Sequence, residues 1–138
     1  MISVLFSCSA TKSDETSYSV IAIGEYGTVE NRSFEVLTST QEFITKIENL
    51  SIDESYLEKI TAIDFNESTV VGIHLGQKNN GGYSIAIESV TENDKEVVLK
   101  VKEIGPKQNQ AVTMALTQPF CYVALAKTTK KIEVKFLD

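Results

Sequence analysis

Residues 68–88 read STVVGIHLGQKNNGGYSIAIE and hold two β-rich segments around a polar turn. Apolar side chains alternate in residues 69–75 and again in residues 83–90, with the period of two that is typical of a half-buried strand. Between these segments, Asn80 and Gly81 form a pair that readily adopts positive φ, as a tight hairpin turn requires. We therefore predict a β-hairpin here and expect the rest of the fold to be arranged around it.

A helix is predicted upstream of this hairpin. Residues 39–42 read STQE, a capping box in which the Ser39 side chain accepts from the backbone N–H of Glu42 and the glutamate reaches back. The apolar residues that follow share one helical stripe: Phe43, Ile44, Ile47 and Leu50. A second short helix is expected in residues 51–60, and Asp64 is expected to cap a backbone turn before the hairpin.

Strand-like patterns recur along the rest of the chain. They lie in residues 19–24, 33–38, 97–101, 120–126 and 132–137. Polar turns at residues 91–95 and 127–131 separate the later ones. The predicted architecture is α+β: a mostly antiparallel β-sheet, built as a sandwich or partly open barrel of about seven strands, with one inserted amphipathic helix.

The bulk composition restricts both the domain count and the partners. A chain of 138 residues is long enough for one core, and we expect residues 18–138 to form a single domain after a tether at residues 1–17. The net charge of −6 opposes binding to a phosphate backbone, so nucleic acid is not expected as a partner. No apolar run approaches the roughly 20 residues that cross a bilayer.

The N-terminal segment has features of a lipoprotein signal. An apolar run ends at Leu5-Phe6-Ser7-Cys8, which resembles a lipobox, and a flexible polar stretch follows. The run before Cys8 has no basic region and is shorter than a full signal, so either the true start lies upstream or the match is accidental. We expect Cys8 to carry a lipid, and the protein to be an envelope lipoprotein facing the periplasm or a secreted protein.

Residues with catalytic potential occur singly in the sequence. His74 has no second histidine, cysteine or acid cluster at ligand spacing, so it is interpreted as a structural strand residue. Cys121 lies in an apolar strand-like run, which favours a buried free thiol. The pair Gly81-Gly82 precedes a strand rather than a helix and lacks the spacing of a phosphate loop. We therefore predict a protein that is not an enzyme and that has no cofactor and no metal site.

The longest segment without a regular pattern is residues 105–118. Connections above about 12 residues without structure of their own are uncommon and tend to be functional or disordered. This one contains Val112, Met114 and Leu116 and no acidic residue, so we expect it to fold down onto the sheet. A packed structural loop and a partner-binding loop are both compatible with this composition.

Several segments, in this order and spacing, resemble the PrcB family, the C-terminal domain of protease complex subunit PrcB. They are residues 63–65 (IDF), 75–76 (LG), 80–85 (NGGYSI), 105–106 (GP) and 111–120 (AVTMALTQPF). The resemblance extends over about residues 18–134. It implies a non-catalytic envelope or secreted protein that associates with a partner protein, a protease in the case that names the family, and supports or stabilises it.

A second resemblance is carried by fewer residues. The turn Asn79-Asn80-Gly81-Gly82-Tyr83 with a later Pro119-Phe120 is similar to loops of chagasin-type cysteine protease inhibitors. The alternative function is therefore inhibition of a protease by insertion of this turn into an active-site cleft.

Strand directions predict where a partner would bind. Because residues 83–90 and 97–101 should run antiparallel, the polar turn and the long loop are expected at the same end of the sheet. The predicted partner-binding residues combine apolar anchors with polar neighbours. They are Asn79, Asn80, Gly81, Gly82, Tyr83, Lys107, Met114, Leu116, Gln118, Pro119 and Phe120. Membrane contact is expected only through the lipid on Cys8, and the sequence does not indicate an oligomeric state.

Overall fold

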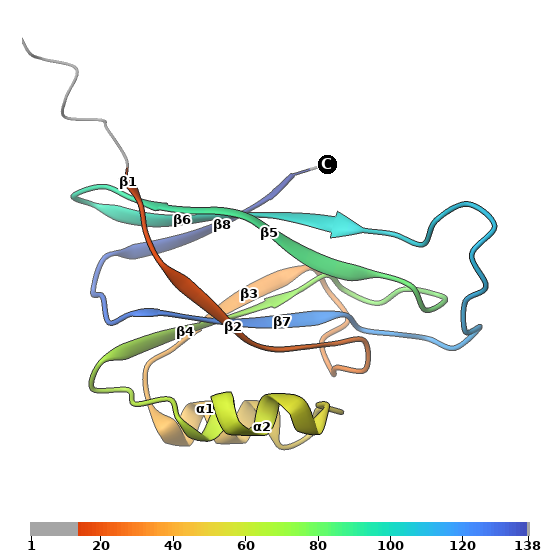
Figure 1. The fold of residues 1–138 in the computed structure, drawn as a ribbon, viewed down its shortest axis with the longest axis horizontal. Helices are drawn as coiled ribbons and strands as arrows, with labels where there is room; N and C mark the ends of the chain where they lie inside the picture. The colour runs from red at the N-terminus through yellow and green to blue at the C-terminus, as the bar shows by residue number, and fades with distance from the viewer. Residues whose placement is uncertain (1–13, 138) are drawn as a thin grey trace, which may run out of the picture.

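The computed structural model describes residues 14–137, which form two packed β-sheets with helices on one side (Figure 1). One sheet, here called the outer sheet, has the strand order β1-β5-β6-β8, and the other, the central sheet, has the order β2-β7-β4-β3. The strands are β1 (Asp14–Glu15), β2 (Tyr18–Gly24), β3 (Ser33–Leu37), β4 (Ser68–His74), β5 (Ser84–Glu92), β6 (Glu96–Ile104), β7 (Phe120–Ala126) and β8 (Lys131–Leu137). The predicted mostly antiparallel sandwich is confirmed, with eight strands among the described residues and no closed barrel.

The central sheet is buried on both faces. Val71 and Ile73 of β4 belong to the core between the two sheets, together with Leu99 of β6. Val70 of β4 and Tyr122 of β7 belong to a second core on the helix side of the sheet. This placement explains why β4 is buried at every residue from its second to its last, rather than at alternate positions.

The predicted hairpin is wrong. β4 pairs with β3 and β7 in the central sheet, whereas β5 pairs with β6 and β1 in the outer sheet. The polar turn between β4 and β5 is therefore a crossing from one sheet to the other. Within the described chain, the glycines with positive φ are Gly76 and Gly82, so Asn80 and Gly81 do not form the predicted positive-φ pair.

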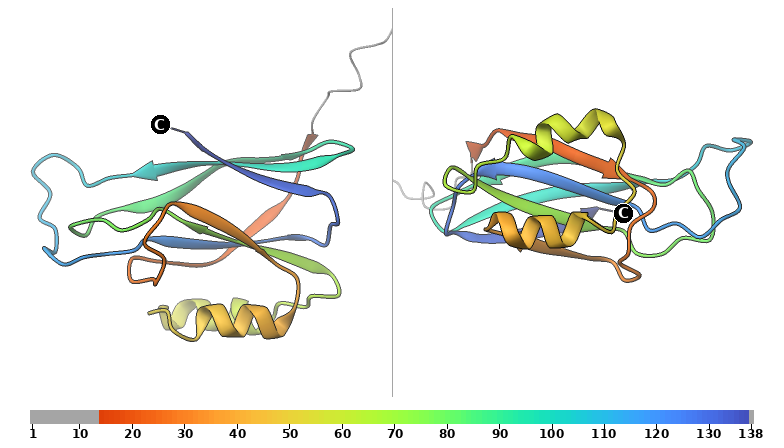
Figure 2. Two further views of the ribbon diagram at one scale, coloured as in Figure 1. Left: turned by 180° about the vertical axis from the view of Figure 1, so that it is seen from behind. Right: turned by 90° about the horizontal axis from the view of Figure 1, so that it is seen from below.

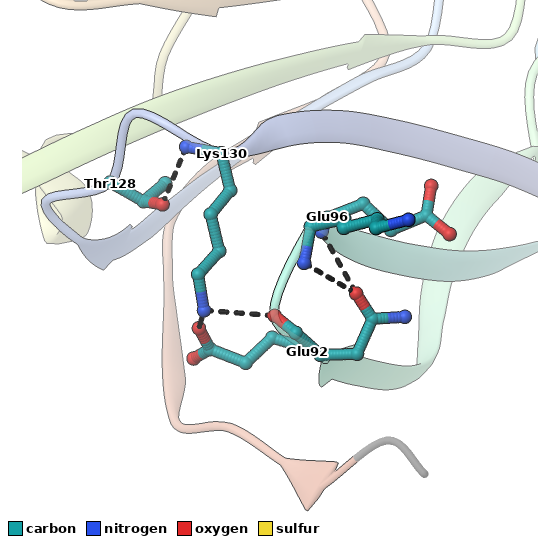
Figure 3. A network of polar contacts seen from close by, with 6 residues as sticks. Glu92, Glu96, Thr128 and Lys130 are labelled. Atoms are coloured by element: carbon teal, nitrogen blue, oxygen red, sulfur yellow. Dashed lines mark hydrogen bonds and ion pairs between the residues drawn. The ribbon is translucent and has the colours of Figure 1, made fainter. Parts of the chain in front are cut away.

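The connection from β7 to β8 also crosses between the sheets, and β8 then pairs parallel to β6. The parallel pair was not expected from the sequence. Lys130, the residue before β8, donates from Nζ to Glu92 Oε2 at 2.7 Å and to the carbonyl oxygen of Asn93 at 2.9 Å (Figure 3). Lys130 thereby attaches this crossing to the turn between β5 and β6.

Two short helices cover the outward face of the central sheet (Figure 2): α1 (Thr40–Ile47) and α2 (Leu57–Thr61), the latter preceded by a 3-10 turn, η2 (Glu54–Tyr56). The capping box is confirmed at Ser39, whose side chain accepts from the N–H of Glu42 at 3.2 Å. The returning Glu42 carboxylate accepts from the N–H of Thr38 at 3.0 Å, one residue before the expected donor.

The predicted apolar stripe of α1 is correct only in part. Phe43 is buried against the central sheet, but Ile44 is half-exposed. Because the helix has only eight residues, a narrow stripe centred on Phe43 is enough to cover the sheet beneath it. Asp64 accepts from the N–H of Asn66 at 2.9 Å, as the turn-capping prediction requires.

Regular structure begins before the expected boundary at Tyr18. The short strand β1 pairs Asp14 with Glu92 and Glu15 with Thr91 of β5. The chain then crosses to the central sheet, where β2 pairs with β7. Cys8, the predicted lipid anchor, lies outside the described residues. None of the helices in residues 14–137 is long and apolar enough to cross a membrane.

Gly72 lies in the middle of β4, on the helix side of the central sheet. Because it has no side chain, Tyr122 and Glu35 can pack directly against its backbone. A Cβ atom on this residue would lie 2.7 Å from Tyr122 Cε1 and 2.8 Å from Glu35 Oε2. We predict that Gly72→Ala lowers the free energy of unfolding by about 1–3 kcal/mol in urea titrations, because overpacking forces these buried groups apart.

Gly105→Ala is the matched control, since a Cβ there would first meet Tyr83 Cε1 at an ordinary 3.4 Å. Equal stability of the Gly72 variant and this control would contradict the close packing around β4.

Candidate functional site

Three connections meet at one end of the sandwich, here called the loop end. They are residues 25–32 between β2 and β3, residues 75–83 between β4 and β5, and residues 105–119 between β6 and β7. The last of these extends well beyond the sheets (Figures 1 and 2).

The prediction that the polar turn and the long loop lie at the same end of the sheet is confirmed, and the two are in contact. The backbone of Lys78 donates to the carbonyl of Thr117 at 2.8 Å, and the Thr117 N–H donates back to Lys78 at 3.0 Å. Further out, the Gly81 N–H donates to the carbonyl of Thr113 at 2.8 Å. Main-chain hydrogen bonds therefore hold the outer part of the long loop against the turn.

Glu25 joins the third connection to the other two. Its carboxylate accepts from the N–H of Gly82 at 2.7 Å, and its carbonyl accepts from the N–H of Gln118 at 2.7 Å. The Gln118 carbonyl in turn accepts from Gly27 at 3.1 Å. No sequence pattern indicated Glu25, because the residues that it contacts are far away along the chain.

Gly82 is required where the turn passes under the long loop. Its φ is +96°, in the region that favours glycine, and a Cβ would lie 2.9 Å from Pro106 Cβ and 3.0 Å from Val112 Cγ1. Pro106 and Val112 are themselves partly buried. The two connections are therefore packed together as well as hydrogen-bonded.

A charged cluster borders the loop end. Glu103 Oε1 lies 2.9 Å from Lys78 Nζ and 3.0 Å from a guanidinium nitrogen of Arg32. Burial acts to raise the pKa of Glu103, but the ion pairs with Lys78 and Arg32 outweigh it and lower the pKa. The Lys78 ammonium also lies 5.1 Å from the centre of the Tyr83 ring. Lys78 therefore contacts one face of the Tyr83 ring, and both residues belong to the connection between β4 and β5.

The apolar residues of the long loop do not cover the sheet as expected. Met114 is 84% exposed and Leu116 is 54% exposed, because the hydrogen bonds to residues 78–81 hold this part of the loop beyond the last strand residues. On the neighbouring connection, Tyr26 is 43% exposed. Large apolar side chains that remain in water on a hydrogen-bonded loop are candidates for contact with a partner.

The other predicted partner-binding residues divide into three groups by exposure. Asn79 and Lys107 are exposed, whereas Asn80, Gly82, Tyr83 and Gln118 are partly buried. Gly81, Pro119 and Phe120 are buried, and Phe120 packs in the helix-side core. Pro119 and Phe120 therefore stabilise the fold, and their side chains are not accessible to a partner in this structure.

A cleft of about 330 Å³ opens beside Tyr83, where the end of β2 lies next to the start of β5. Its lining residues are Ile23, Gly24, Glu25, Gly82, Tyr83 and Ser84. The cleft adds a hollow to the loop end, between the end of β2 and the turn residues Gly82 and Tyr83.

A second polar cluster lies under α1, and it includes His74. Glu35 Oε2 accepts from His74 Nε2 at 3.0 Å and from the Tyr122 hydroxyl at 3.1 Å, while Lys46 Nζ lies 3.3 Å from Oε1. His74 is buried, and its contacts agree with the structural interpretation of this residue. Glu35 is 39 residues away in the sequence, so the spacing of the residues could not reveal it.

The environment of this cluster favours an ionised carboxylate. Burial acts to raise the pKa of Glu35, but hydrogen bonds and charge from His74, with Tyr122 and Lys46, lower it to about 2. Burial and the Glu35 charge raise the pKa of Tyr122. The tyrosine therefore stays protonated as a donor, and the cluster stabilises the fold through a satisfied buried network.

Stability should depend on pH through Glu35. Its pKa is about 2 in the fold, below the ordinary 4.5, so its contribution is complete above pH 4.5 and is lost as the pH falls towards 2. We predict that Glu35→Gln lowers the free energy of unfolding at pH 6 by about 1–3 kcal/mol and flattens its fall between pH 4.5 and 2.5.

Urea unfolding across this pH range measures the effect, with the exposed β5 carboxylate in Glu88→Gln as the control. A wild-type slope retained in the Glu35 variant would show that other acids control the acid sensitivity.

Within residues 14–137, no three histidine, cysteine, aspartate or glutamate side chains come together in a way that could hold a metal ion. Burial raises the pKa of the Cys121 thiol to about 12, which keeps it protonated at neutral pH.

One comparison with known proteins found a matching family model. Residues 69–126 match the family model described as PrcB C-terminal, so the resemblance found in the sequence is confirmed over this segment. No curated protein and no solved structure matches the chain. The matched segment runs from the second residue of β4 to the last residue of β7 and contains both the polar turn and the long loop.

Proposed function

Because residues 69–126 match the PrcB C-terminal family, we propose that this protein is a non-catalytic subunit that binds a protein partner, a protease, and supports or stabilises it. The observation that carries the proposal is the exposure of Met114 and Leu116 on a loop held by main-chain hydrogen bonds. Binding energy at protein interfaces concentrates in a few apolar or aromatic anchors ringed by polar groups, and these two side chains are such anchors.

The order of the loop end supports binding in a second way. A loop that is disordered before binding loses conformational entropy when it docks, and this loss reduces affinity. Here the pairing of Lys78 with Thr117 and of Gly81 with Thr113 fixes the long loop in advance. The entropy cost is met during folding, so the exposed side chains can contribute more of their contact energy to affinity.

The position of the family match supports the same surface. The matched segment begins at residue 69 and ends at residue 126, so it includes the turn and loop that project from the central sheet. It excludes β2, β3, both helices and β8. The loop end is thus formed mainly by the part of the chain that the family model describes.

We predict that a photo-crosslinking amino acid at position 114 captures one protein partner in cells. The same amino acid at position 44 is the matched control, because Ile44 is also an exposed apolar residue but lies on α1. Mass spectrometry of the products identifies the partner. Equal capture from both positions, or capture from position 44 alone, would contradict binding at the loop end.

With the partner purified, Leu116→Asp should weaken binding by at least about tenfold, as expected for an anchor worth more than 1 kcal/mol. Isothermal titration calorimetry measures the affinity, and Leu57→Asp, an exposed leucine of α2, is the control. Leu116 is exposed, so the variant should unfold at the wild-type urea concentration. Unchanged affinity would place the contact elsewhere.

The same purified pair distinguishes the two modes of action. A supporting subunit leaves the protease active and lengthens its lifetime. An inhibitor of the chagasin type abolishes substrate turnover at a stoichiometric ratio. Complete loss of turnover would overturn the supporting role and favour inhibition.

A further inference from the structure

β8 (Lys131–Leu137) forms one edge of the outer sheet. Its pairing partner among the described residues is β6, on one side only. The backbone groups on the other side of a seven-residue edge strand are available to a further strand. Charged side chains, especially lysine, protect many such edges against unspecific pairing with another strand.

The solvent-facing charges of β8 alternate in sign, so a neighbouring strand with opposite charges in register can pair with them. Lys131, Glu133 and Lys135 occupy alternate positions, while Ile132 and Val134 face the core between the sheets. Lys135 also lies beside Lys100 of β6 in the strand register. Like charges on neighbouring strands repel, so Lys135 would gain from a carboxylate on its open side.

A second copy of the chain can supply that carboxylate. In an antiparallel two-fold pairing, the residue at the centre opposes itself and the others pair symmetrically about it. Centring on Glu133 opposes Glu133 to itself and Lys131 to Lys135, which is repulsive. Centring on Val134 opposes Glu133 to Lys135 twice and uses all seven residues of β8.

We propose that β8 is a self-association edge, and that two copies of the chain pair antiparallel through it with Val134 at the two-fold axis. The outer sheets of the two copies then form one continuous sheet across the axis. The β8 edge contains none of the residues proposed to bind a protease, so the association does not depend on that binding.

Exposed apolar side chains beside this edge support the same occupant. Phe34 and Val36 of β3 oppose Ile73 and Val71 in register, so they share the face that packs on the outer sheet. They are nevertheless 36% and 39% exposed. The Arg32 guanidinium, just before β3, lies 4.7 Å from the centre of the Phe136 ring, which places β8 near this strand. Extension of the outer sheet by a second copy would cover Phe34 and Val36.

Charge exchange tests the register. Sedimentation equilibrium of the wild type should show a reversible dimer with twice the 15.2 kDa mass of one chain. Glu133→Lys places lysine opposite lysine at two sites and should weaken the dimer by at least about tenfold. Adding Lys135→Glu restores opposite charges at both sites and should return the dissociation constant to within about threefold of wild type.

Glu88→Lys is the matched control, because Glu88 is an exposed glutamate of the same sheet on β5, away from the β8 edge. It changes the net charge equally and should leave the dimer unchanged, while circular dichroism verifies the fold of each variant. A wild type that stays monomeric at millimolar concentration would overturn the proposal. So would a double variant as weak as Glu133→Lys, or a Glu88 variant weakened equally.

Discussion

The antiparallel pair of β4 and β7, buried on both faces, is the feature on which the rest of the structure depends. All seven residues of β4 pair with β7, from Ser68 opposite Ala126 to His74 opposite Phe120. On one face Val71 and Val123 pack against the outer sheet, and on the other Val70 packs under the helices. Each apolar face must be covered by another layer to be removed from water. The chain therefore forms both a second sheet and a helical layer, one for each face of this strand pair.

This pair also positions the loop end. Because the strands are antiparallel, the residues that leave β4 lie beside those that enter β7, and the Leu75 N–H still donates to the carbonyl of Pro119 at 3.0 Å. Phe120, at the start of β7, is fully buried and fixes where the long loop re-enters the sheet. The exposed part of the loop is therefore attached directly to a fully buried residue of the core.

The sequence predicted the local elements well and the pairing between them poorly. The ends of β7 and the capping box at Ser39 depend on residues that are close together in the sequence. A short stretch of sequence was therefore enough to predict them. The strand that pairs with β4 could not be predicted in this way, because the alternating pattern of β4 fits a hairpin with β5 as well as a pair with β7. The second apolar face, Val70 with the space at Gly72, was the signal that favoured a central position.

The candidate site divides in the same way. The meeting of the polar turn and the long loop was predictable from strand direction, whereas the exposure of Met114 was not, since an apolar residue in a loop usually indicates burial. Glu25 and Glu35 could not be found, because each contacts residues that only the tertiary fold brings near. Phe120 was predicted to bind a partner, but its side chain packs in the helix-side core.

The most direct test of this account is amide hydrogen exchange of the protein alone, followed by NMR. If β4 and β7 organise the loop end, their amides exchange most slowly, and the amides of Lys78, Gly81 and Thr117 exchange at least about a hundredfold more slowly than those of the exposed residues 108, 109 and 111. Exchange of Lys78, Gly81 and Thr117 as fast as residues 108, 109 and 111 would contradict it, because the loops would then not be fixed before a partner arrives.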